Sequence, residues 1–403
     1  MKKYGLMLFL IFSVSCFSKN EKSQQLQADT IKKKIVEEKN ASEENTNEIY
    51  KDRMKNFIRE IRNDAGKSKY IITQNGNELY FRDGNLDKNF FSVTDGTTQE
   101  SLYYGDVLKY NVTTKKESKD YMLSLLYPVR KEGKPVFVIN YAKGNEKKDF
   151  LTKEDARTGF VSELLPEFEA RAIYSPIQGF NSENITNLRQ VKNYLLLLNP
   201  EKFIDINQYF EYLKNTDFDL LLIEPSHNGV FFTKNQVEQL KIKKNGGKRI
   251  VISYLSIGEA EDYRAYWKKE WSKKWPKWIV KENPDWKGNY IVKYWNNEWK
   301  SVIREYREKL DSIGVDGYLL DTVDSYYYFQ EKMEKGKVLR ELEKLLNRDF
   351  QYINAGRISL VANTKEITTD LVKKICLELN INPLQITKAD LITFIQHFKG
   401  YNI

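Results

Sequence analysis

Acidic and amide side chains recur directly after short apolar segments of this sequence. The carboxylates concerned are Asp95, Glu224, Glu259, Glu261, Asp321 and Asp324, and the amides are Gln74, Asn75 and Asn140. If the apolar segments are parallel strands, their carboxyl ends meet at one rim and gather these side chains. Converging carboxylates repel one another, so some acquire raised pKa values. A pair with separated pKa values can supply the acid and the base or nucleophile that cleavage of a glycosidic bond requires.

Asp321 is our first candidate for one member of such a pair, and Glu259 or Glu224 for the other. Each acid also has a structural interpretation, because carboxylates after strands commonly cap the next helix. Glu261 and Arg264 stand at the i,i+3 spacing of a simple helical ion pair. The expected substrate-binding residues are Gln74, Asn75, Asp95, Asn140, Tyr254, Glu261, Arg264, Trp295 and Asp324.

The chain is poor in the residues that usually bind transition metals. It has two histidines, His227 and His397, and two cysteines, Cys16 and Cys376. These numbers leave little room for a multi-His centre and exclude a disulfide framework or a Cys-rich zinc site. Carboxylate oxygens also bind hard cations, but no Asp-x-Asp-x-Asp-Gly calcium loop is present. We therefore expect no metal and no cofactor.

All seven tryptophans lie between residues 263 and 299. Aromatic rings stack on the apolar faces of sugars, and Trp286, Tyr290 and Trp295 are the best candidates to line a cleft. The helical spacing of Tyr263, Trp267 and Trp271 instead favours packing between a helix and the sheet.

Apolar runs alternate with amphipathic stretches from residue 50 to about 330, which predicts a parallel sheet covered by helices. Eight runs fit a (β/α)8 TIM-type barrel. A doubly wound open sheet also satisfies the alternation, but no Gly-rich dinucleotide loop follows any run. The expected strands are 70–73, 91–94, 135–141, 171–174, 193–198, 219–223, 249–254 and 316–320. The expected helices are Met54–Asn63, Asp205–Lys214, Thr233–Lys243 and Glu298–Ile313.

The two ends of the chain differ from this middle part. Residues 1–15 have the basic start and short apolar run of a signal peptide, followed by Cys16 as in a bacterial lipoprotein; a secretory signal with an incidental cysteine is the alternative. Residues 16–49 are polar and predict a flexible tether behind a lipid anchor, which places the protein on the extracytoplasmic side of a membrane. Residues 331–403 predict a helical extension, with helices near 331–347, 368–379 and 388–398.

Three long segments resemble the glycoside hydrolase family 114 superfamily, which includes endo-α-1,4-polygalactosaminidases, and more closely its extracellular bacterial and archaeal branch. They are 251–267 (VISYLSIGEAEDYRAYW), 282–295 (ENPDWKGNYIVKYW) and 314–329 (GVDGYLLDTVDSYYYF). The resemblance implies a (β/α)8 barrel that cleaves a glycan, such as polygalactosamine, with carboxylates. Segments 54–58, 72–76, 94–105 and 136–141 resemble the second half of the same barrel, which in relatives follows the segment at 321–329. The two halves therefore look circularly permuted, as a closed barrel permits.

Three positions depart from the family pattern. Leu319 replaces a glutamate of the polygalactosaminidase-type members, Asn140 replaces a common aspartate, and Glu224 stands where an aspartate is common. These losses leave open a second hypothesis, a glycan-binding or surface-interaction lipoprotein on a barrel that no longer catalyses. The net charge is +9, and +7 without residues 1–15. The basic residues that carry it are interspersed with acidic ones along the chain. We therefore expect a glycan partner and a membrane anchor, and no nucleic acid.

Overall fold

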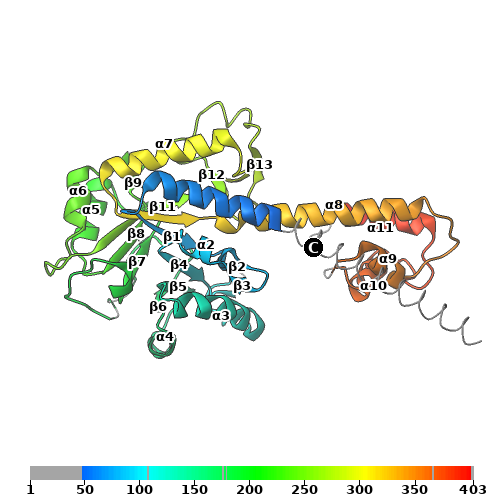
Figure 1. The fold of residues 1–403 in the computed structure, drawn as a ribbon, viewed down its shortest axis with the longest axis horizontal. Helices are drawn as coiled ribbons and strands as arrows, with labels where there is room; N and C mark the ends of the chain where they lie inside the picture. Colours follow the sequence, from blue (N-terminus) through cyan, green and yellow to red (C-terminus); the bar gives the residue numbers. More distant parts are fainter. Residues whose placement is uncertain (1–47, 107–108, 175–176, 178, 365–366, 401–403) are drawn as a thin grey trace, which may run out of the picture. The chain divides into compact units, whose positions relative to one another are not determined.

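A computed structural model of the chain describes residues 48–106, 109–174, 177, 179–364 and 367–400. Its centre is an eight-stranded sheet in the order β6-β5-β4-β1-β15-β11-β8-β7, in which every neighbouring pair is parallel (Figure 1). The end strands β6 and β7 also approach each other, so the sheet is nearly closed. The strands are β1 Tyr70–Gln74, β4 Gly96–Glu100, β5 Val136–Tyr141, β6 Val161–Leu165, β7 Tyr194–Leu197, β8 Leu220–Ile223, β11 Ile250–Ser256 and β15 Gly317–Asp321. The predicted TIM-type barrel is confirmed.

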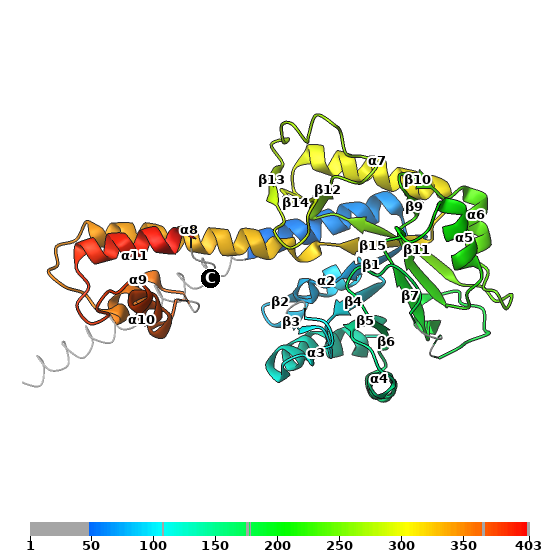
Figure 2. The same cartoon turned by 180° about the vertical axis from the view of Figure 1, so that it is seen from behind.

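Helices surround this sheet on the outside (Figures 1 and 2). Residues 53–65 are helical, and the later outer helices are α3 Lys116–Lys131, α4 Asn145–Thr158, α5 Ile206–Lys214, α6 Lys234–Leu240 and α7 Asn297–Ile313. Local chemistry fixes several ends: the side chains of Asp205 and Asn296 accept N–H groups at the starts of α5 and α7. Gly314 ends α7 with φ 88°, a conformation that glycine adopts without steric cost.

The strands alternate between interior and exterior, and their interior side chains fill the barrel. Ile72, Ile139, Leu222, Ile252 and Leu319 belong to this buried core. Side chains two positions apart on a strand point to the same side. The residue two positions after such an interior residue, at the carboxyl end of the strand, therefore points into the mouth of the barrel. The residues so placed are Gln74, Glu100, Tyr141, Glu224, Tyr254 and Asp321.

Two expected strands are wrong. Residues 91–94 end the short helix α2 Lys88–Phe91 and form a turn, and the strand follows at β4 Gly96–Glu100. Residues 171–174 form no strand, and β6 precedes them at Val161–Leu165. β4 reads GTTQE and β6 reads VSELL, so polar residues interrupt the apolar runs on which the prediction depended.

A small antiparallel sheet is inserted between β11 and α7. It consists of β12 Glu259–Glu261, β14 Asn289–Val292 and β13 Ile279–Glu282, in the order β12-β14-β13. The remaining short elements are η1 Asn77–Tyr80, β2 Phe81–Arg82, β3 Asn85–Leu86, η3 Leu188–Gln190, β9 Ser226–His227, β10 Val230–Phe231 and η4 Val323–Ser325.

The expected C-terminal helices are present, with α9 in addition. They are α8 Tyr326–Leu346, α9 Ala355–Ala362, α10 Thr369–Glu378 and α11 Lys388–Gly400. Leu342, Ile358, Ile375 and Phe394 form a second buried core among them.

The predicted signal peptide, Cys16 and the tether as far as residue 47 lie outside the described residues. Among the residues that are described, no helix combines the length and the hydropathy needed to cross a bilayer.

Candidate active site

Asp321 ends β15 and faces the mouth of the barrel. Its Oδ2 accepts a hydrogen bond from the Tyr254 hydroxyl at 2.9 Å, and its Oδ1 accepts one from the backbone N–H of Thr322 at 2.6 Å. Loss of solvation raises the pKa of Asp321 to about 8, and the nearby carboxylate of Glu100 adds to the shift. Asp321 can therefore hold a proton at neutral pH.

Glu100 ends β4 and was missed in the sequence, because the strand before it was not recognised. Its Oε1 accepts the Tyr141 hydroxyl and its Oε2 accepts the side-chain amide of Asn75 at 2.6 Å. Asn75 Oδ1 in turn accepts the backbone N–H of Glu100 at 2.9 Å. Two contacts thus fix Asn75 and Glu100 together, and contact of Asn75 with substrate stays a prediction. The signal that could have found Glu100 is its spacing of two from Thr98 and Gly96, which places all three residues on one face of a strand. The structure shows that this face is the interior one, because a Cβ at Gly96 would touch interior side chains.

A cavity of about 290 Å³ opens beside Glu100. Its acidic lining residues are Glu78, Glu100 and Asp324, and none of the described residues that line it is basic. Loss of solvation and then the charge of Glu100 raise the pKa of Asp324 to about 7. The other lining residues are Asn75, Gly76, Asn77, Gln99, Met122, Leu125 and Tyr327. The cavity is therefore suited to hydroxyl and amino groups.

Arg264 joins two further carboxylates in a buried network. Its guanidinium bonds Glu224, and its Nε bonds Glu261 Oε2 at 2.6 Å. The Ser226 hydroxyl also donates to Glu224, at 2.5 Å. Burial raises the pKa of Glu261 to about 8, with a smaller contribution from the Asp321 charge. The network therefore positions groups around the mouth, and contact of Arg264 with substrate stays a prediction.

Glu259 lies at the start of β12 and is held by the hairpin that follows. The side-chain amides of Asn283 and Asn289 donate to its two oxygens at 2.9 and 3.3 Å. Burial raises the pKa of its carboxyl.

Accessibility divides these acids into two groups. Glu224, Glu259 and Glu261 are buried, with exposed fractions of 3%, 7% and 2%. Asp321 and Glu100 are partly exposed, as is Asp324. A substrate entering the mouth therefore meets Asp321 and Glu100 first. Asp321 remains the leading candidate, Glu100 joins it, and the catalytic roles of Glu224 and Glu259 stay predictions. Gln74 is buried, and its Oε1 accepts the Thr98 hydroxyl.

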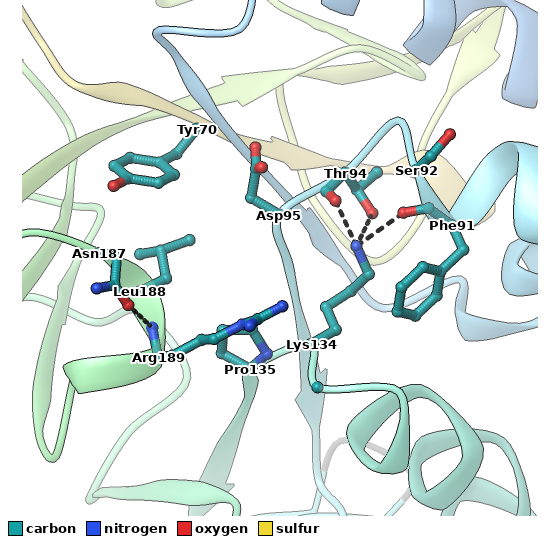
Figure 3. A pocket seen from close by; sticks show the side chains of 11 residues that line it. Tyr70, Phe91, Ser92, Thr94, Asp95, Lys134, Pro135, Asn187, Leu188 and Arg189 are labelled. Atoms are coloured by element: carbon teal, nitrogen blue, oxygen red, sulfur yellow. Dashed lines mark hydrogen bonds between the residues drawn. The ribbon is translucent and has the colours of Figure 1, made fainter.

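The placement of Asp95 at this rim is wrong. Asp95 precedes β4, so it lies at the amino end of the strands, where it bonds Arg62 and the backbone N–H of Ile71. It lines a cavity of about 550 Å³ together with Tyr70 and Lys134 (Figure 3). The error follows from taking 91–94 as the strand.

Asn140 does not face the mouth either. It precedes the interior residue Tyr141, so its side chain points away from the barrel axis, where its Oδ1 accepts the backbone N–H groups of Tyr103 and Tyr104 at 3.0 and 3.2 Å. Its Nδ2 is buried without a hydrogen-bond partner in the described part of the chain. Asn140 therefore fixes the loop that contains Tyr103 and Tyr104. An aspartate at this position could accept the same two N–H groups and would leave no N–H donor without a partner. The expectation that Asn140 binds substrate is wrong in placement.

Most aromatic side chains of residues 263–299 pack against other aromatic rings. Tyr290 pairs with Ala260, so its side chain leaves the small sheet on the face opposite to Glu259 and Glu261. There Trp267 stacks on Tyr290 at 5.0 Å between ring centroids. Trp295 packs on Phe329 at 4.7 Å and lies under the Arg53 guanidinium at 4.6 Å. Packing accounts for Trp295, and its contact with substrate stays a prediction.

Among the described residues, no group of three or more His, Cys, Asp or Glu side chains has the geometry to hold a metal ion.

Comparison with known proteins bears on the half of the barrel that carries Asp321. The glycoside-hydrolase family GH114 model matches residues 198–365. An uncharacterized protein of Methanocaldococcus jannaschii is 42% identical over 151 residues, which cover 38% of this chain and 43% of the relative. An uncharacterized protein of Thermotoga maritima is 35% identical over 138 residues, covering 32% and 42%. The chain thus spans less than half the length of these relatives. Over residues 198–365, which include Glu224, Glu259 and Asp321, the protein resembles the glycoside hydrolases of family GH114.

Proposed function

We propose that this protein is a glycoside hydrolase in which Asp321 and Glu100 form the catalytic pair. The observation that carries the proposal is that both partly exposed carboxylates face the mouth of the barrel and that Glu100 contributes to the raised pKa of Asp321. Two carboxyl groups of this kind are what most glycosidases use.

The contacts suggest how the two roles divide. Asp321 keeps its proton at neutral pH and can give it to the leaving glycosidic oxygen. Glu100 is aimed by Tyr141 and Asn75 and serves as the base or the nucleophile on the other side of the bond. The pKa of Tyr141 is raised well above its usual range, by burial first and then by Glu100, so this tyrosine stays a donor.

The substrate class follows from the charge of the mouth. Glu78, Glu100 and Asp324 line the cavity beside the pair without a basic partner among its lining residues. This arrangement favours a neutral or cationic sugar, such as a polymer of galactosamine, over an acidic one. With the predicted signal peptide and Cys16, we further propose a lipoprotein that reaches this glycan from an extracytoplasmic membrane surface.

The test is hydrolysis of α-1,4-linked galactosamine polymer, followed by the release of reducing ends. Asp321→Asn and Glu100→Gln should each lower kcat by roughly 10²–10⁴-fold, the range that general acid–base groups contribute. Asp285→Asn, which removes an exposed acid of the inserted hairpin, is the matched control and should keep full activity. Full turnover by either variant of the pair would remove that residue from the mechanism.

The second candidate is a glycan-binding protein without catalysis, suggested by the acids missing at positions 319 and 140. Leu319 fills the barrel core and Asn140 holds a loop, so neither replacement takes a carboxylate from the mouth itself. Calorimetric binding of the same polymer without reducing ends released by the wild-type protein would favour this alternative.

A further inference from the structure

Tyr263 is an exposed aromatic residue held rigidly beside the carboxylates. Its side chain follows β12 and is 59% exposed. Its hydroxyl donates to Glu261 Oε1 at 2.8 Å and lies 3.1 Å from Asn289 Oδ1. The Arg264 guanidinium lies over the ring at 5.3 Å from its centroid. One end and one face of the ring are thus fixed, while much of the ring remains open to solvent.

Three successive contacts link this ring to Asp321. Tyr263 bonds Glu261 Oε1, the same oxygen accepts the Tyr254 hydroxyl at 3.3 Å, and Tyr254 bonds Asp321 at 2.9 Å. The charge of Asp321 is also among the causes that raise the pKa of Tyr263. The open ring therefore lies on the side of the mouth formed by β11 and β12.

Trp275, another exposed aromatic ring of the insertion, lacks this relation to the site. Trp275 is 45% exposed, but it packs against Tyr290 at 5.5 Å, on the face of the small sheet that turns away from Glu259 and Glu261. Exposure alone therefore does not single out Tyr263. Its fixed hydroxyl and its place beside the carboxylate network do.

We propose that the ring of Tyr263 is a stacking platform for a sugar unit bound next to the scissile bond, so that this residue sets the affinity for the glycan. The inference rests on the proposed glycoside hydrolase function. Sugar rings present apolar C–H faces that stack on aromatic rings. A ring already immobilised by its hydroxyl loses little conformational freedom when a ligand binds.

The experiment compares Tyr263→Leu, Tyr263→Phe and the control Trp275→Leu, using α-1,4-linked galactosamine oligosaccharides as the probe. Tyr263→Leu removes the ring and should raise KM about tenfold, the effect of one aromatic contact, while kcat changes much less. Tyr263→Phe keeps the ring under Arg264 but loses the hydroxyl contact, so its KM should rise much less than that of Tyr263→Leu. Trp275→Leu should leave both constants unchanged.

Calorimetry of the same oligosaccharides with each variant separates this proposal from the catalytic one. If the wild-type protein binds the oligosaccharides without hydrolysing them, the proposed hydrolase function is contradicted. The stacking platform is then supported if Tyr263→Leu weakens binding and contradicted if it does not. Equal affinity of Tyr263→Leu and wild type, an equal loss in the Leu and Phe variants, or no binding by the wild type would each overturn the platform.

Discussion

The carboxyl of Asp321 illustrates how one residue links stability to chemistry. Its pKa is about 8 in the folded protein, against an ordinary value of 3.8. Between these two pH values the unfolded chain releases a proton that the folded protein keeps. The free energy of unfolding therefore falls as pH rises through this window. Asp324 and Glu261 are shifted in the same direction, to about 7 and about 8.

Asp321→Asn should therefore stabilise the protein while it lowers kcat. The amide stays neutral at every pH, so we expect the variant to unfold at higher urea concentration than the wild type at pH 7.5, by at least about 1 kcal/mol. Near pH 4 the difference should shrink, because this pH is close to the ordinary pKa of 3.8 and the unfolded chain then binds part of the proton as well. Urea titrations at pH 4.5, 6.0 and 7.5 measure this. A constant difference across the three pH values would contradict the raised pKa.

Individual residues could be predicted where a strand was recognisable by its apolar run. The run 316–320 led to Asp321 and Asp324, and the run 249–254 led to Tyr254, Glu259 and Glu261. Glu100 escaped because β4 has polar residues along its length. Asp95 was misplaced for the same reason. The strand was predicted at 91–94, which puts Asp95 after it, whereas the strand begins at Gly96 and Asp95 precedes it. The contacts of Asn140 with Tyr103 and Tyr104 join residues far apart in sequence, which no local pattern indicates.

At the scale of elements, two loops must touch for the mouth to form. Gly258 in the turn between β11 and β12 donates its N–H to the Thr322 hydroxyl at 2.8 Å. A Cβ at Gly258 would lie 2.1 Å from the Thr322 carbonyl oxygen and 2.2 Å from the Ser325 hydroxyl oxygen. Only glycine permits this approach, which brings the loop of Glu259 against the loop that follows Asp321.

Gly258→Ala should push these two loops apart. We expect a loss of roughly 1–3 kcal/mol in the free energy of unfolding, as for other overpacked sites, together with a lower kcat. Thermal unfolding and kinetics measure the two effects. Gly336→Ala is the matched control: Gly336 lies within α8, where Arg340 Nη1 is 3.6 Å from the position of the added methyl, so alanine should be neutral or stabilising there. A Gly258→Ala variant as stable and active as the wild type would contradict the required contact.

At the scale of the whole molecule, the carboxylates of the mouth come from both halves of the chain. Asp321 lies within residues 198–365, which match the family, whereas Glu100 precedes them. β1 pairs directly with β15, and β4 pairs with β1, so the barrel makes neighbours of its first and last strands. The sequence allowed this closure to be predicted from strand count and order. We propose that the chain order is a circular permutation of the family's barrel.

A rearranged gene tests that proposal. Placing residues 175–330 ahead of residues 53–174, joined by a short Gly/Ser linker, keeps the core residues Ile185, Leu188 and Val191 and restores the order inferred for relatives. The linker can be short, because Arg53 and Phe329 both contact the ring of Trp295. A closed barrel retains every strand pair after such a cut, so we expect a folded protein with a cooperative thermal transition and retained hydrolysis. The same fragments mixed as separate chains are the control for covalent order. A rearranged chain that stays unfolded would show that the native order is needed to bring Glu100 and Asp321 together.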